Sequence, residues 1–209
     1  MKKIIFFVLA FILALTGCSG VAEQTKENVT EEKFIVNSMR WGTSWQDAQK
    51  VLENYKIAKE DSNRVAIEIE KYTYLGVNGK LMMEFSVAEN SFPATGFTQA
   101  YFVYDEGDEE ILLNAGEREY GERKNFFLDK NGVENPLNPP AWYSSETLEE
   151  SLSEEEMDAY RKVLDGKDIE PTRMDAIMRG PLVVISASEE INMVRFQGDK
   201  AAIVENLRK

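Results

Sequence analysis

Residues 64–87 read RVAIEIEKYTYLGVNGKLMMEFSV, and this stretch decides the fold. Apolar side chains take every second position from Val65 to Ile69 and again from Leu81 to Val87. Alternation with period two is typical of a β-strand that buries one face. The pair Asn78-Gly79 lies between the two runs, and such a pair is the strongest short signal of a hairpin turn. We therefore expect an antiparallel hairpin around Asn78-Gly79.

A helix is expected before this hairpin and a third strand after it. Thr43 with Gln46, or Ser44 with Asp47, has the spacing of a capping pair at a helix start. An apolar stripe with helical spacing follows, formed by Trp45, Ala48, Leu52 and Tyr55. We expect this helix to run to about Tyr55 and to place Trp41 and Trp45 in the core. The aromatic and β-branched stretch 97–104 predicts the third strand.

The second half of the chain is less regular. Gly121 follows a weak helical pattern over 109–120, and three prolines predict a loop over 129–143. Ser153 and Glu156 have the spacing of a capping box, which predicts a helix with Met157, Tyr160, Val163 and Leu164 on its buried face and an end at Gly166. The remaining expected elements are a short helix over 171–178, strands over 182–187 and 191–197, and a C-terminal segment around 201–207.

Segregated helices and strands predict the α+β class, with helices packed on one face of an antiparallel sheet. Residues 34–209 have the length of one domain. Within it, residues 107–209 are expected to be a possible degenerate copy of a helix-plus-strands unit formed by residues 34–106.

The N-terminus has the pattern of a signal peptide. Lys2 and Lys3 precede a 12-residue apolar run, Ile4–Leu15, which is shorter than the roughly 20 residues that a membrane-spanning helix requires. Leu15-Thr16-Gly17-Cys18 resembles the lipobox of bacterial lipoproteins. This resemblance implies that residues 1–17 are removed and that Cys18 receives a diacylglycerol thioether and an N-acyl chain. The alternative is an ordinary secretory signal in which Cys18 is incidental.

Cleavage before Cys18 leaves 22 basic and 37 acidic side chains, a formal net charge of −15. This charge argues against nucleic acid as a partner and against a polybasic hold on anionic lipid. Residues 18–33 carry few large apolar side chains, so we expect a lipidated N-terminus and a flexible tether there. The expected location is extracytoplasmic, with the lipid anchored in the cell membrane.

Several chemistries are excluded by composition. The chain has no His and one Cys. It therefore lacks a histidine-based nucleophile pair, a histidine metal ligand, an internal disulfide and a Cys-x-x-Cys motif. The acidic runs 105–110 and 146–156 do not have the ligand order of a calcium-binding EF-hand loop. We expect no metal and no cofactor.

The order of helix, hairpin and third strand in residues 34–104 is similar to that of small modules in bacterial lipoproteins. These are the SmpA/OmlA-like and β-lactamase-inhibitor-protein-like domains, in which a Gly and a Ser or Thr open a helix that packs on an antiparallel sheet. Gly42-Thr43-Ser44-Trp45 matches that opening. The resemblance implies a protein-binding or envelope-assembly module, with an envelope protein as its partner and no catalytic residues.

Two candidate functions therefore follow from the sequence. The first is a membrane-anchored, non-enzymatic binding module, in which Trp142 and Tyr143, placed after two prolines in the expected loop, are the candidate partner-binding residues. The alternative is a carboxylate-dependent hydrolase of envelope glycans, since a pair of catalytic acids needs no fixed spacing. A deep cleft with two acids and a raised pKa would favour the hydrolase, whereas a cleft-free sheet face would favour the binding module.

Overall fold

The computed structural model describes residues 34–88, 94–125, 140–164, 178–179, 181–188 and 192–209. Its elements follow one another along the chain: α1 (Trp45–Ala48), β1 (Lys56–Glu60), β2 (Arg64–Tyr74), β3 (Val77–Ser86), β4 (Gly96–Tyr104), α2 (Glu109–Tyr120), β5 (Lys124–Asn125), β6 (Pro140–Tyr143), α3 (Leu148–Ser151), α4 (Glu154–Leu164), β7 (Val184–Ser188), β8 (Met193–Gln197) and α6 (Asp199–Leu207).

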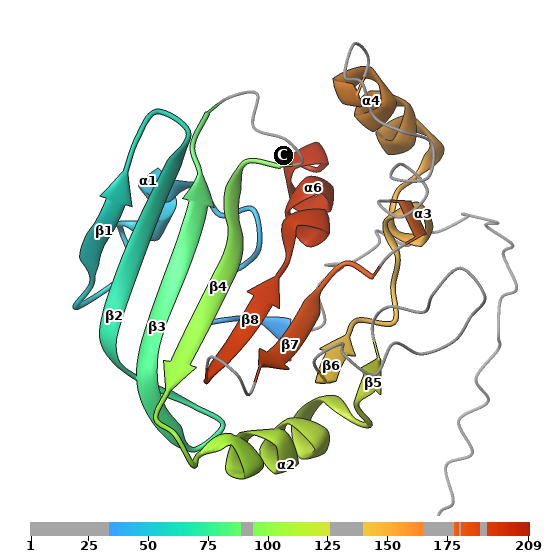
Figure 1. Ribbon diagram of the computed structural model, residues 1–209. Helices are drawn as coiled ribbons and strands as arrows, with labels where there is room; N and C mark the ends of the chain where they lie inside the picture. Colours follow the sequence, from blue (N-terminus) through green and yellow to red (C-terminus); the bar gives the residue numbers. More distant parts are fainter. Residues whose placement is uncertain (1–33, 89–93, 126–139, 165–177, 180, 189–191) are drawn as a thin grey trace, which may run out of the picture.

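The described strands form one antiparallel sheet in the order β1-β2-β3-β4-β8-β7-β6-β5 (Figure 1). Each half of the chain contributes a run of sequential neighbours, and β4 pairs with β8 where the halves meet. A helix precedes the strands in each half, α1 in the first and α2 in the second. One hydrophobic cluster contains residues of both halves, and the fold is of the α+β class, as the sequence predicts.

The period-two segments of the sequence are strands with one buried face. On β3, Leu81, Met83 and Phe85 are fully buried, whereas Lys80, Met82 and Glu84 between them are only partly buried. Directly paired residues of antiparallel strands share a face. The register therefore extends the buried face through Ile67 on β2, Phe102 on β4 and Phe196 on β8.

The hairpin turn lies three residues before the predicted pair. Leu75 and Gly76 have φ angles of 50° and 86°, whereas Asn78 and Gly79 are paired within β3. Two consecutive positive φ angles form the turn type that follows the twist of a two-residue hairpin. Gly79 has another role, since a Cβ there would lie 2.7 Å from the Phe102 ring. The Asn-Gly signal therefore identified the hairpin correctly but misplaced its turn.

The first helix is much shorter than expected. Ser44 caps it by accepting a hydrogen bond from the Asp47 N–H at 3.1 Å, but α1 ends at Ala48 and not near Tyr55. Asn54 has a φ of 54°, which ends any helical path, and the chain then forms β1 along the outer edge of β2. The main-chain hydrogen bonds of this edge replace the expected last turns of the helix. Sequence periodicity did not predict β1.

Helices occupy one face of the sheet, and Trp41 lies where both halves meet. Its ring is 1% exposed and stacks on Phe97 with centroids 4.6 Å apart, and its indole Nε1 donates to the Phe34 carbonyl at 3.1 Å. A Cβ on Gly198, at the start of α6, would clash with this ring. Trp41 is therefore core, as predicted. Trp45 is only partly buried and packs against Phe85 at 5.2 Å.

In the second half of the chain, the expected helix start at Ser153 is confirmed, whereas part of one expected loop is a strand. Ser153 and Glu156 form the predicted capping box, with hydrogen bonds of 2.7 and 3.2 Å. Val163 is 50% exposed, so it does not belong to the buried face of α4. Residues 140–143 form β6 instead of a loop, which a proline permits as the first residue of a strand. The expected helix end at Gly166 and most of the expected helix over 171–178 lie outside the described residues.

Candidate functional site

The sheet face opposite the helices is the largest shared surface of the described strands, and we call it the open face. None of the described helices lies over it (Figure 1). Its side chains are those that register with Lys80, Met82, Glu84 and Ser86 of β3. They are Arg64, Ala66 and Glu68 on β2, followed by Glu70 at a bulge, Gln99, Tyr101 and Val103 on β4, Met193, Arg195 and Gln197 on β8, Val184, Ser186 and Ser188 on β7, and Ala141 and Tyr143 on β6. Ala66, Val184 and Ala141 are buried, and the other members are at least partly exposed.

Charges pair with one another on β1, β2 and β3, a region that we call the ion-pair half of the open face. Lys80 Nζ lies 3.1 Å from Glu68 Oε1 and 3.4 Å from Glu70 Oε2, and Lys56 Nζ lies 3.0 Å from Glu70 Oε1. Arg64 Nη1 lies 3.3 Å from Glu84 Oε2. The carboxylates of this half therefore already have cationic partners.

The other part of the open face, on β4, β8, β7 and β6, has a different character, and we call it the arginine half. Arg195 is the one ionic side chain among its registered positions. Its Nη2 donates to Gln99 Oε1 at 3.1 Å, and its guanidinium carbon lies 5.8 Å from the centre of the Tyr101 ring. The Tyr101 hydroxyl donates to the same Gln99 oxygen at 2.7 Å. Three side chains from two strands thus hold one another in place.

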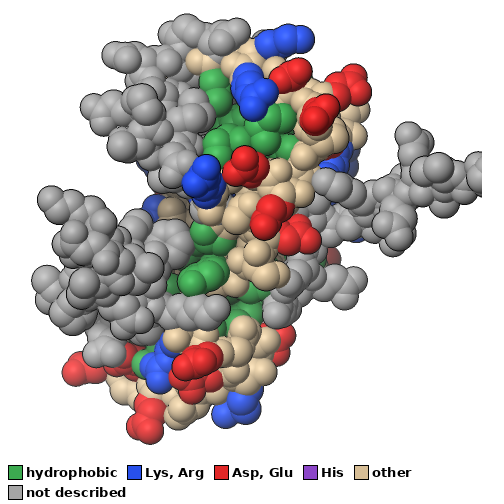
Figure 2. Space-filling view, turned by 90° about the vertical axis from the view of Figure 1, so that its right-hand side faces the viewer, with side chains coloured by type: hydrophobic (Ala, Val, Ile, Leu, Met, Phe, Trp, Pro, Cys, Tyr) green, Lys and Arg blue, Asp and Glu red, His purple; other side chains and the backbone are tan. Residues whose placement is uncertain are grey.

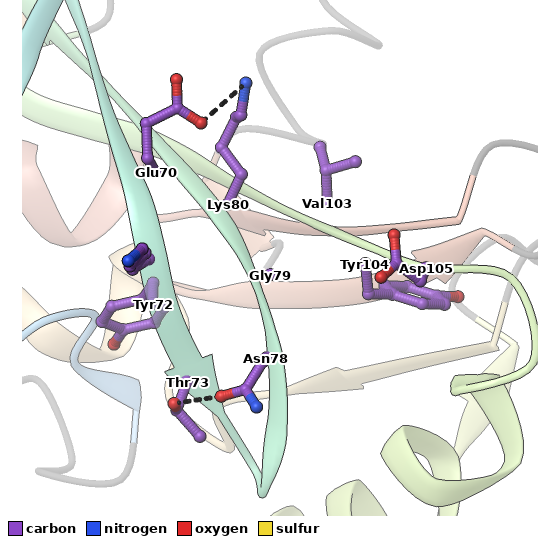
Figure 3. A pocket seen from close by; sticks show the side chains of 10 residues that line it. Glu70, Tyr72, Thr73, Asn78, Gly79, Lys80, Val103, Tyr104 and Asp105 are labelled. Carbon is purple, nitrogen blue, oxygen red and sulfur yellow. Dashed lines mark hydrogen bonds and ion pairs between the residues drawn. The ribbon is translucent and has the colours of Figure 1, made fainter.

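A shallow cavity of about 640 Å³ lies at the hairpin end of the ion-pair half (Figure 3). Glu70 and Lys80 turn toward each other across it, and Thr73 donates to Asn78 Oδ1 at 2.7 Å (Figure 3). Hydrogen bonds from the Lys56 ammonium and from the Lys80 ammonium lower the pKa of Glu70 to about 2. Glu70 is therefore ionised at neutral pH and is unsuited to donate a proton to a leaving group.

Asp199 is a carboxyl group whose pKa burial raises above its ordinary value. It stands at the first position of α6, and its charge in turn contributes to the raised pKa of Tyr160. Asp199 lines none of the three described cavities, which open elsewhere on the surface. A glycan hydrolase requires its proton-donating acid to face a second acid across the substrate. Asp199 faces none of these cavities, so its raised pKa has no substrate site beside it among them.

The two loop residues proposed for partner binding lie on opposite faces of β6. Trp142 is 3% exposed, packs on Gly116 and Tyr120, and donates from Nε1 to the Gly121 carbonyl at 2.9 Å. Tyr143 is only partly buried and belongs to the open face. A partner would therefore reach Tyr143 more readily than Trp142, and partner binding by either residue stays a prediction. Cys18 lies outside the described residues.

Sequence reasoning missed the arginine half of the site. The alternation Val194-Arg195-Phe196 already places Arg195 on the face opposite two apolar residues. The same reasoning places Tyr101 opposite Ala100 and Phe102. Strand order was the missing information, because only the pairing of β4 with β8 brings Arg195 next to Tyr101 and Gln99.

The side of the molecule that carries α3 and α4 is chemically mixed. On the side that carries α3 and α4, charges of both signs are interspersed with hydrophobic side chains (Figure 2). The described residues contain no cluster of three Cys, Asp or Glu side chains able to hold a metal ion. Within the same residues, no helix combines the length and apolarity needed to span a bilayer.

Comparisons with family models, curated proteins and solved structures return no match to this chain. Its function is therefore inferred from the geometry of the open face and from the sequence of its N-terminus.

Proposed function

We propose that this chain is a membrane-anchored bacterial lipoprotein that acts as a non-enzymatic binding module, with the open face of the sheet as its binding surface and an envelope protein as its partner. The observation that carries the proposal is the composition of this face. It combines Tyr101, Tyr143, Met82, Met193 and Arg195 on strands that the core holds from behind. Tyr, Met and Arg are enriched in protein interfaces.

Rigidity of the open face supports binding over catalysis. The opposite side of the same strands is buried in the core. Phe85, Phe102 and Phe196 on that side are each at most 1% exposed. Side chains on such strands lose little additional freedom when a partner docks, which favours affinity. The cavity on this face is shallow, and its ion-paired Glu70 suits a structural role. The carboxylate-dependent hydrolase has no corresponding observation in its favour.

The anchoring part of the proposal rests on the sequence Leu15-Thr16-Gly17-Cys18. A diacylglycerol and an N-acyl chain on Cys18 would hold the domain at the membrane, because several acyl chains give stable anchoring where one chain does not. Intact-mass analysis of protein extracted from membranes tests this step. An unmodified Cys18 thiol, or a mature N-terminus at another residue, would contradict it.

Site-specific photo-crosslinking tests the binding surface. A photoreactive phenylalanine is placed at Met193 or Val103 on the open face of the full-length, membrane-located chain. Matched positions are Ile111 on α2 and Val163 on α4, which are 53% and 50% exposed and lie away from this face. We expect a discrete protein adduct from the open-face positions alone.

Two outcomes would refute the proposal. Adducts of equal yield from all four positions would indicate random collision, and adducts from the helix positions alone would move the binding surface elsewhere. Recovery of the same partner in both open-face adducts would identify it directly by mass spectrometry.

A further inference from the structure

Arg195 has no ionic partner in the part of the chain that the structure describes, although the sequence is strongly acidic. The sequence contains 37 acidic and 24 basic side chains. Ion pairs with carboxylates are formed by the strand residues Lys56, Lys59, Arg64 and Lys80. Among the described residues, no carboxylate forms an ion pair with Arg195, and its Nε is buried without an acceptor. One carboxylate of this face, Glu84, is already engaged by Arg64. Arg195 therefore keeps N–H donors that no described residue accepts from.

The guanidinium is also held in place before any partner arrives. Gln99 fixes one end of it through Nη2, and the Tyr101 ring lies beneath it at 5.8 Å. An arginine presents five N–H donors in a planar fork that matches a carboxylate. The bond to Gln99 uses one of them, and the Tyr101 hydroxyl is a second hydrogen-bond partner of Arg195, so the fork keeps further donors for an incoming group. A preorganised fork loses less entropy on binding than a mobile one.

The positions that flank Arg195 differ on its two sides. Val103 and Met193, which pair with each other, form an apolar border on one side. Gln99 and Gln197, which also pair, form an amide border on the other side. Ser186 lies directly across from Arg195 on β7. The surroundings therefore suit one negative charge between an apolar group and hydrogen-bonding groups. The nearby charges of Glu84 and Arg64, which act on Tyr101, already pair with each other.

We propose that Arg195 binds an Asp or Glu carboxylate of the partner protein, and that this carboxylate is flanked in the partner by an apolar side chain that contacts Val103 and Met193. This inference rests on the proposed function, because it names the chemistry of the partner of the open face. This carboxylate forms an ion pair with Arg195, for which the described residues provide no ionic partner. Charge-assisted, bidentate contacts of this kind are among the strongest hydrogen bonds in proteins.

Other anionic partners fit less well. A nucleic acid or an anionic lipid surface presents many charges, and the negative net charge of this chain would repel both. A second copy of the chain would meet the same repulsion. A single carboxylate set in a largely uncharged protein surface gains the contact with Arg195 at a smaller long-range cost.

Peptide selection with a defined probe tests the inference. The full chain is immobilised through its N-terminus and used to select binders from a random 12-residue peptide library, first alone and then with excess inorganic phosphate. Enriched peptides are synthesised with their acidic residue as Asp or Glu and, in matched form, as Asn or Gln. Their dissociation constants are measured on the wild type, on Arg195→Gln and on Lys80→Gln.

Lys80→Gln is the matched control, because it removes one positive charge from the same sheet face but lies in the ion-pair half. We expect the enriched peptides to share an acidic residue next to an apolar one. Neutralising that residue should weaken binding to the wild type and to Lys80→Gln by at least about tenfold, and should have little effect on Arg195→Gln. Arg195→Lys should recover only part of the affinity, since it keeps the charge and loses the fork.

The outcomes separate this inference from the proposed function. Peptides that compete with one another for the open face but carry no common acid, or whose acid is insensitive to Arg195→Gln, would overturn the inference and leave the binding module intact. Loss of binding in excess phosphate with no dependence on the peptide acid would identify a phosphate site instead. Absence of any enriched peptide, or binding unaffected by Met193→Lys on the open face, would count against both proposals. Thermal unfolding of each variant confirms that it remains folded.

Discussion

The two faces of the sheet are built from alternating residues of the same strands, yet they have opposite properties. On β4, Ala100 and Phe102 point toward the helices and are fully buried, whereas Gln99, Tyr101 and Val103 between them are partly exposed. The helix-covered face is continuous across both halves of the chain and contains Trp41, Phe97 and Phe196. The open face carries ion pairs at one end and Arg195 at the other. One face thus stabilises the fold, and the other is the face that we propose binds a partner.

This contrast has an energetic basis. Burial of aromatic and aliphatic side chains is the main favourable contribution to folding, at about 25 cal/mol per Å² of apolar surface. Exposed ion pairs contribute little, typically about 0–1 kcal/mol, because water screens them. Substitutions on the helix-covered face should therefore change the free energy of unfolding, whereas those on the open face should change binding.

The largest effect is expected for Trp41→Ala. This substitution removes the ring that stacks on Phe97 and bonds to the Phe34 carbonyl, so it should lower the free energy of unfolding by roughly 3–5 kcal/mol. Tyr101→Ala on the open face is the matched aromatic control and should cost less than half as much. Urea denaturation measures both. Equal losses for the two variants would remove the proposed difference between the faces.

The next effect concerns the contact between Trp41 and Gly198. A Cβ at position 198 would clash with the Trp41 ring, so Gly198→Ala should cost about 1–3 kcal/mol through overpacking. The cost should shrink when the ring is reduced by Trp41→Phe, because the two changes share one contact. A double-mutant cycle by denaturant unfolding measures this coupling. Strict additivity would show that the alanine methyl group finds space without moving the ring.

A third prediction compares a charge pair on the helix side with those on the open face. Arg208 Nε donates to Glu156 Oε1 at 3.0 Å and joins α6 to α4. Burial alone would raise the pKa of Glu156, but hydrogen bonds from Ser153 and Arg208 outweigh it and hold the pKa below its ordinary value of 4.5. A lowered pKa in the folded state stabilises the fold above the unfolded value and loses this contribution as the pH falls through the folded value.

Glu156→Gln should therefore cost about 1–2 kcal/mol at pH 7. The difference from the wild type should diminish as the pH falls below about 4.5, because the wild-type carboxyl group then becomes protonated. Chemical denaturation over a pH series measures this trend. A difference that stays constant down to acidic pH would mean that the charge of Glu156 does not contribute.

The smallest effect is expected for Glu68→Gln in the ion-pair half of the open face. Its partner Lys80 Nζ is 3.1 Å away, but the side chains are 21% and 37% exposed and Lys80 keeps its contact with Glu70. The free energy of unfolding should change by less than about 1 kcal/mol, and added salt should reduce the change further. Denaturant midpoints at low and high salt provide the measurement. A loss as large as that for Glu156→Gln would make the open face a structural element as well.

Local patterns predicted much of this fold. Period-two alternation identified β2 and β3, and aromatic and β-branched content identified β4. The strands β7 and β8 were also expected from the sequence, and spacing of polar residues identified the caps at Ser44 and Ser153. Local patterns failed where tertiary contacts override them. The chain after Ala48 leaves its helical path for the edge of β2, and Pro140–Tyr143 pairs with β7 although prolines predict a loop. Both segments form main-chain hydrogen bonds that only a neighbouring strand supplies.

The sequence by itself determined which residues share a face, because successive side chains of a strand point to opposite sides whatever the strand pairs with. It therefore determined the α+β class, the buried position of Trp41 and the outward position of Arg195. Only the tertiary structure decided that β8 pairs with β4, which joins Gln99 to Arg195 across 96 residues of sequence. Pairing between distant strands depends on how the whole core packs, and no local period encodes it. The binding site proposed on the open face belongs to this second kind of information.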